Sequence, residues 1–155
     1  MVRRALCFLP VLAVVVVAAC SGGNSVVGKW KMTGISGMPP GVAPTITFES
    51  GDKFAWGFDM DLGSFDPNMK GTVTTTVSGT YKLTGNTMAL TPSDVQFKFT
   101  GVDPAIESMM KPAMEGQKAQ MMDQMKSSSG GEITWVSKDK FTVKGPKETA
   151  TFERM

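Results

Sequence analysis

The sequence predicts a mainly β protein: an antiparallel meander of about nine short strands that closes into a small barrel, with one helical segment. Apolar and polar residues alternate with a period of two over most of the chain after residue 27, the pattern of half-buried strands. Turn residues separate these runs at short intervals, which favours antiparallel neighbours. Only residues 103–127 break the alternation. We therefore expect a barrel domain over residues 27–155 with a helical insert near residues 103–127.

The N-terminus has the three parts of a secretory signal peptide. Arg3 and Arg4 are followed by an almost wholly apolar run over residues 6–17 and by small side chains at residues 18–19. The apolar run is shorter than the roughly 20 residues that a membrane-spanning helix needs. We expect residues 1–19 to be a signal peptide that is removed.

A cysteine follows this segment directly. The stretch Val17-Ala18-Ala19-Cys20 resembles a bacterial lipobox. The resemblance implies that Cys20 is S-diacylglycerylated, carries acyl chains such as palmitate, and becomes the first mature residue. Two or more acyl chains anchor a protein stably. Ser21 resembles the outer-membrane type of sorting signal, so we expect an extracytoplasmic lipoprotein, on the outer membrane in a Gram-negative host. The alternative is an ordinary secretion signal with an incidental cysteine.

Charge and composition exclude several functions. The chain has 16 basic and 14 acidic residues, and removal of Arg3 and Arg4 leaves the two in balance. A balanced surface argues against a nucleic-acid partner. The two cysteines are Cys7, in the signal peptide, and Cys20, so no disulfide is expected in the mature chain. Histidine is absent, which removes the commonest general base and zinc ligand.

The first half of the domain follows a short polar tether at residues 20–26. Strands are expected near residues 29–33, 45–49 and 53–60, and the last two form a hairpin around Ser50-Gly51-Asp52. A long strand follows over residues 72–83. The inward faces are predicted to carry Trp30, Met32, Ile46, Phe48, Phe54, Trp56, Phe58, Met60, Val73, Val77, Tyr81 and Leu83.

The remaining strands are shorter. Gly85-Asn86 should turn the chain into a strand over residues 87–91, and Pro92-Ser93 should separate it from another over residues 95–100. Three more strands are expected around residues 133–135, 141–143 and 150–152. Every mature aromatic residue except Phe65 falls on an inward face, so we expect side chains to fill much of the interior.

The helical insert begins at Asp103-Pro104, which suits an N-cap and first turn. Pro112 predicts a kink or two short helices near Lys111. Six of the 13 methionines lie in this segment: Met109, Met110, Met114, Met121, Met122 and Met125.

On a helix, Met110, Met114, Met121 and Met125 share one broad face, which has three interpretations. The favoured one is a packing lid on the barrel, because unbranched methionine fills irregular gaps. The second is an adaptable gate for a lipid-like ligand or a partner. The third is capture of Cu(I) by thioether sulfurs.

Three short motifs resemble lipocalins and the small lipocalin-like lipoproteins of bacteria. They are Gly28-Lys29-Trp30, residues 78–88 and residues 151–154. The resemblance implies a lipocalin-like β-barrel that binds a small apolar molecule, with Arg154 packed over Trp30. A guanidinium over an indole gains cation–π attraction. The chain departs from the family by placing its helix before the last three strands, where lipocalins place it before the last strand.

No nucleophile and base stand at motif spacing, so we expect neither enzymatic activity nor a cofactor. Asp59, Asp61 and Asp66 form a loose acidic cluster, and a solvated loop is favoured there over a calcium site because Asp-x-Asp alone is a weak signal.

We therefore expect a membrane-anchored protein that binds a small apolar ligand. The residues expected to line the site are Trp56, Phe58, Tyr81, Phe97 and Trp135, with Met110 and Met114 at its mouth. One alternative is a structural or interaction lipoprotein of the cell envelope with a filled barrel, whose protein partner the sequence does not identify. The other is a methionine-based Cu(I)-handling protein.

Overall fold

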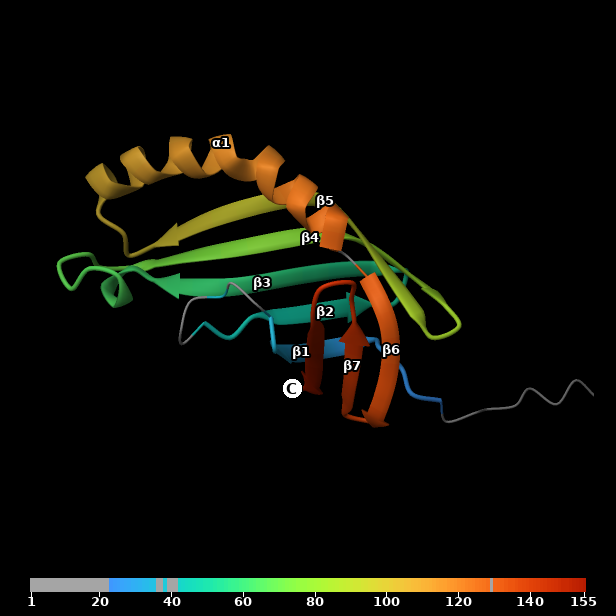
Figure 1. The fold of residues 1–155 in the computed structure, drawn as a ribbon. Helices are drawn as coiled ribbons and strands as arrows, with labels where there is room; N and C mark the ends of the chain where they lie inside the picture. The colour runs from blue at the N-terminus through green and yellow to red at the C-terminus, as the bar shows by residue number, and fades with distance from the viewer. Residues whose placement is uncertain (1–22, 36–37, 39–41, 129) are drawn as a thin grey trace, which may run out of the picture.

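The computed structural model describes residues 23–35, 38, 42–128 and 130–155 (Figure 1). The expected signal peptide over residues 1–19, Cys20 and Ser21 lie outside the described residues. Within the described part, eight antiparallel strands form a closed barrel in sequence order, and one long helix precedes the last three strands. The predicted fold, a lipocalin-like barrel with a helical insert, is confirmed. The elements are β1 (Gly28–Thr33), β2 (Thr45–Glu49), β3 (Lys53–Asp61), η1 (Leu62–Ser64), β4 (Thr72–Thr84), β5 (Thr87–Thr100), α1 (Pro104–Ser128), β6 (Gly130–Ser137), β7 (Lys140–Lys144) and β8 (Thr149–Arg154).

The prediction of about nine strands is wrong by one, because β5 continues through Pro92. The register between β4 and β5 shifts at Ser78 and Gly79, so that Ser93 has no partner residue across the ladder. Such a bulge tolerates a proline, which has no N–H to donate. A Cβ atom on Gly79 would collide with the carbonyl oxygen of Thr91, so glycine permits this close approach.

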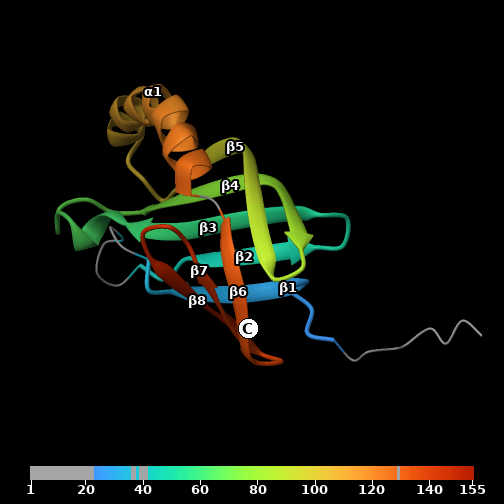
Figure 2. The same ribbon diagram turned by 45° about the vertical axis from the view of Figure 1, so that its right-hand side comes forward.

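The barrel has two distinct ends. Strand β1 begins and β8 stops at one of them, together with the β2–β3, β4–β5 and β6–β7 turns; we call it the Arg154 end. The opposite end carries η1 and the β7–β8 turn at Gly145–Glu148; we call it the Glu148 end. Figure 2 shows the short strands β6, β7 and β8 in front of the longer β3 and β4.

Helix α1 covers the part of the barrel wall where β5 and β6 are not paired. Strand β5 pairs with β6 only through residues 87–89, and α1 packs along β5 beyond them. Its last turns bring Met121, Met122 and Met125 against the core. Of the helices described, none has the length and apolar character needed to cross a membrane.

Of the two alternatives predicted near Lys111, a kink or two short helices, the second is wrong, because α1 is one continuous helix through Pro112. Figure 1 shows it curved along its length. A proline removes one backbone hydrogen bond and costs about 3 kcal/mol, which packing of the later turns can offset.

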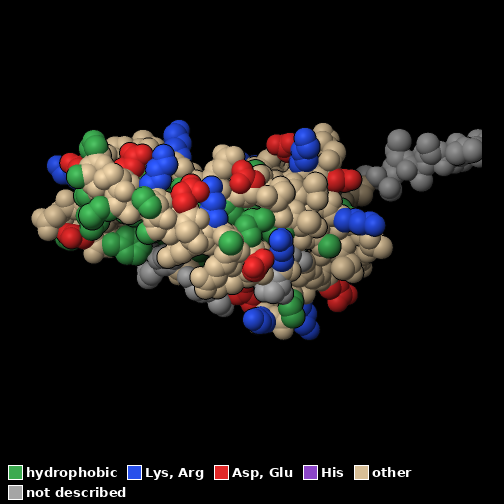
Figure 3. All heavy atoms as spheres, turned by 90° about the horizontal axis from the view of Figure 1, so that it is seen from above, with side chains coloured by type: hydrophobic (Ala, Val, Ile, Leu, Met, Phe, Trp, Pro, Cys, Tyr) green, Lys and Arg blue, Asp and Glu red, His purple; other side chains and the backbone are tan. Residues whose placement is uncertain are grey.

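Completely buried side chains lie toward both ends of the barrel. Trp30 and Phe141 are 0% exposed near the Arg154 end, and Val73, near the start of β4, is 0% exposed toward the Glu148 end. Phe65 is exposed, as its place outside the alternating runs predicts. On the helix side of the surface, lysine and arginine side chains are interspersed with acidic ones, as the balanced charge predicts (Figure 3).

Candidate functional site

The barrel interior holds a cavity of about 200 Å³. It is walled by residues of all eight strands and of α1, and their side chains are overwhelmingly aliphatic, aromatic or thioether groups. Among the lining residues Glu148 alone has a charged side chain. Ile35, Gly145 and Glu148 place the cavity toward the Glu148 end. Its apolar wall includes Ile46, Phe54, Val77, Met125 and Phe152.

Small residues leave this space open. Gly130, Gly145 and Ala150 line the cavity where β6, β7 and β8 pass the end of α1. Gly130 has a φ of 130°, and a Cβ atom there would meet the carbonyl oxygen of Met88. At the Arg154 end the corresponding space is filled by aromatic rings. The cavity therefore lies where β6, β8 and the turn after β7 carry glycine and alanine beside larger side chains of the other strands.

Trp56 is a polar exception in the apolar wall. Its ring lines the cavity and lies 5.5 Å from the Phe58 ring, centroid to centroid. Its Nε1 is buried and has no hydrogen-bond partner among the described residues. An unsatisfied buried donor costs about 1–3 kcal/mol. This is the kind of local cost that often marks a functional position.

Of the seven residues predicted to form the site, only Trp56 lines this cavity. Tyr81 is buried near the Arg154 end, 5.0 Å from the Phe48 ring, and its hydroxyl donates a 3.1 Å hydrogen bond to the Glu49 carbonyl. Burial raises the pKa of the Tyr81 phenol, and the Asp52 carboxylate adds to the effect.

Phe97 and Trp135 pack against the core but lie outside the cavity wall. Phe58 is half-buried and also lies outside the cavity wall. The ammonium of Lys118 lies 5.8 Å above the Phe97 ring. Trp135 packs edge to face on Trp30, at 6.2 Å. Strand alternation correctly predicts that Phe97 and Trp135 pack against the core. It carries no information on whether neighbouring side chains leave space beside them.

The prediction that Met110 and Met114 lie at the mouth of the site is wrong. Met110 and Met114 are half-buried in the first half of α1, and Met125 lines the cavity in their place. The reason is the path of the helix, which starts after β5 and reaches the cavity only in its last turns. The closeness of Met125 in sequence to Gly130 is the signal that could have identified it.

The acidic cluster is explained by local hydrogen bonds. Asp59 accepts a 2.6 Å bond from the Thr74 hydroxyl, Asp61 caps η1, and Asp66 accepts from the backbone and side chain of Asn68. Among the described residues no group of three potential metal ligands drawn from His, Cys, Asp and Glu is found.

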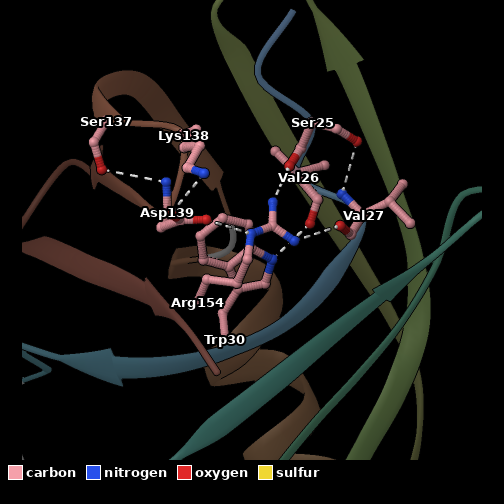
Figure 4. A network of polar contacts seen from close by, with 8 residues as sticks. All are labelled: Ser25, Val26, Val27, Trp30, Ser137, Lys138, Asp139 and Arg154. Atoms are coloured by element: carbon pink, nitrogen blue, oxygen red, sulfur yellow. Dashed lines mark hydrogen bonds and ion pairs between the residues drawn. The ribbon is translucent and has the colours of Figure 1, made fainter. Parts of the chain in front are cut away.

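The Arg154 end is closed by a second constellation, drawn in Figure 4. The guanidinium carbon of Arg154 lies 4.2 Å from the centroid of the Trp30 ring, the arrangement that the lipocalin resemblance implies. The same guanidinium donates to the carbonyl oxygens of Val27 at 3.1 Å and Ser25 at 2.9 Å. Its Nε lies 3.3 Å from the Asp139 carboxylate.

The Arg154 constellation holds the chain just before β1. The Trp30 indole donates a 2.6 Å hydrogen bond to the Val26 carbonyl, so residues 25–27 are bound from two sides. Gly28 makes room for it, because a Cβ atom there would lie 2.5 Å from Nη1 of Arg154. The Gly28-Lys29-Trp30 motif thus closes the barrel and fixes where the N-terminal segment leaves it.

No protein-family model matches the chain, and no curated protein matches it in sequence.

Proposed function

We propose that this protein is an extracytoplasmic lipoprotein that holds a compact apolar molecule in its barrel. The observation that carries the proposal is the cavity of about 200 Å³ with an almost wholly apolar wall. A dry apolar cavity of about 150 Å³ in another protein binds benzene or xenon. By that measure the space accepts one small ring system or one end of a longer molecule, and a whole long-chain fatty acid exceeds it.

Two residues would adapt the cavity to its ligand. Met125 is unbranched, and its rotamers can change the available space at small cost. Trp56 would donate a hydrogen bond to a ligand whose ether or carbonyl oxygen lies beside its unsatisfied Nε1, and this bond would favour binding. The preferred ligand would then be apolar with one hydrogen-bond acceptor.

The alternative is a structural lipoprotein with an interior too small for a ligand. Its support is the cavity size, which lies below the roughly 300–1,000 Å³ of most ligand sites. Exposing the protein to benzene separates the two functions, because benzene fits the cavity without any rearrangement of the barrel.

Benzene binding can be followed through isotope-labelled methionine methyl groups in nuclear magnetic resonance spectra. Benzene should shift the signal of Met125, which lines the cavity, and leave that of Met109, which is 74% exposed. Ala150→Phe, which puts a ring into the cavity, should weaken binding at least about tenfold, equivalent to ~1.4 kcal/mol. Ala89→Phe, on the exposed face of β5, is the matched control and should bind normally. Equal shifts at both methionines, or none, would exclude the ligand function.

Membrane attachment rests on Cys20 and has its own test. Intact-mass measurement should find acyl chains on the mature protein, and Cys20→Ala should remove them and release the protein from the membrane fraction. Cys7→Ala is the control and should leave acylation unchanged. A Cys20→Ala protein that still carries lipid would overturn the anchoring proposal.

A further inference from the structure

Exposed apolar side chains gather at the Arg154 end of the barrel. Among the described residues six large apolar side chains are exposed. Two of them lie elsewhere: Phe65 directly follows η1, and Met109 is in α1. The other four lie at the Arg154 end: Val27 (40% exposed), Leu83 (42%), Val136 (63%) and Met155 (66%). We call these four residues the apolar rim.

The strand pairing explains why these side chains are uncovered. Leu83 continues the inward face of β4, but β3 begins opposite Thr80, so no β3 residue lies beside it. Val136 lies where the β6–β7 register shifts, just before the turn. Val27 and Met155 lie one residue beyond the ends of β1 and β8. Each rim residue thus lies where the pairing of the barrel strands stops.

The N-terminal segment leaves the barrel at this same end. The Arg154 guanidinium binds the Ser25 and Val27 carbonyls there. Only five residue steps separate Ser25 from Cys20, which at about 3.3–3.6 Å per residue reach at most about 18 Å. An acyl anchor on Cys20 would therefore hold the Arg154 end close to the bilayer surface.

We propose that the Arg154 end is the membrane-facing surface of the anchored protein, and that the apolar rim lies against the lipid head groups. The inference rests on the proposed acylation of Cys20. Lys138 and Asp139 at the β6–β7 turn carry both signs of charge, so the contact is shallow and its affinity comes from apolar burial. The Glu148 end, where the cavity lies, then faces away from the bilayer.

A pair of spin-labelled variants tests this orientation. The acylated protein carries Val136→Cys or Met109→Cys, each labelled with a nitroxide, in vesicles of phosphatidylethanolamine and phosphatidylglycerol. At residue 136 the label should collide more with lipid-soluble oxygen than with a water-soluble nickel chelate. At residue 109, on the helix, the nickel chelate should dominate. High salt should not change either result, because charge does not supply the contact.

A second variant tests the rim itself. Leu83→Asp combined with Val136→Asp, read by a label at Met155→Cys, should lose the excess of oxygen collisions. Phe65→Asp, outside the rim, should keep it.

An intact-mass measurement of the same protein distinguishes a failure of the membrane-facing surface from a failure of the acylation of Cys20. Acyl chains on Cys20 with a fully water-exposed label at residue 136 would overturn the membrane-facing surface and leave the anchoring intact. That result is also expected if the rim instead binds a protein. Absence of acyl chains would overturn both proposals.

Discussion

The two ends of the barrel share the alternating strand pattern but differ in packing: one is filled by side chains, and the other contains a cavity. At the Arg154 end, the rings of Trp30 and Phe141 lie 4.7 Å apart, centroid to centroid, and Arg154 covers Trp30. Phe152 stacks on Phe141 at 4.5 Å and also lines the cavity, so it joins the two regions. At the Glu148 end, glycine and alanine replace rings on the last strands, and a cavity remains. The difference shows how side-chain size helps decide whether a stretch of the barrel is a packed core or leaves a cavity.

The two ends also treat tryptophan differently. The Trp30 indole donates a hydrogen bond to the Val26 carbonyl, whereas the Trp56 indole has no partner among the described residues. One ring is fully satisfied and stabilises the fold. The other carries an unmet polar group beside the cavity.

The largest expected effect is on the free energy of unfolding, compared between a phenylalanine at the Arg154 end and one toward the Glu148 end. Phe141→Ala, at a fully buried site, should lower the free energy of unfolding by about 3–5 kcal/mol. Phe99→Ala, at a half-buried site toward the Glu148 end, should lower it by about 1–2 kcal/mol. Urea unfolding measures both. Equal losses would show that the two ends contribute alike and would remove the contrast.

The second effect isolates the indole N–H. Trp30→Phe should cost about 1–3 kcal/mol more than Trp56→Phe, because the first loses a hydrogen bond and the second removes an unsatisfied donor. The change in side-chain volume is identical at the two positions, so each variant controls for the other. A larger loss at Trp56 would mean that its indole is satisfied in solution.

The smallest effect concerns Tyr81, the only tyrosine in the chain. Its pKa is raised above the ordinary value of 10.0 by burial and by Asp52, so folding favours the neutral phenol. This stabilisation is complete below the unfolded pKa and is lost as the pH rises through the folded pKa. Phenolate absorbance should therefore titrate at higher pH in folded than in urea-unfolded protein.

The matching stability measurement uses Tyr81→Phe. Above the ordinary tyrosine pKa, the wild-type protein should lose unfolding free energy faster than this variant. Identical alkaline slopes would show that Tyr81 does not contribute.

Much of the fold could be predicted because alternation and turn residues are local signals. The faces of β1 to β4 and the bounds of α1 follow from them. The continuity of β5 through Pro92 could not, because it depends on a bulge opposite Gly79. The cavity depends on what distant strands leave unfilled, so Trp56 was predicted while Met125 and Ala150 were missed. The Arg154–Trp30 contact came from family resemblance, since residues so far apart in sequence carry no local signal of their pairing.

Native mass spectrometry of the protein purified from its own host tests the central claim, that the barrel holds a ligand, most directly. The account predicts a noncovalent adduct with the mass of a compact apolar molecule on the wild-type protein and its loss from Ala150→Phe. Wild-type protein found only at the mass of the covalent chain, with no adduct, would contradict the account and favour the filled, structural barrel.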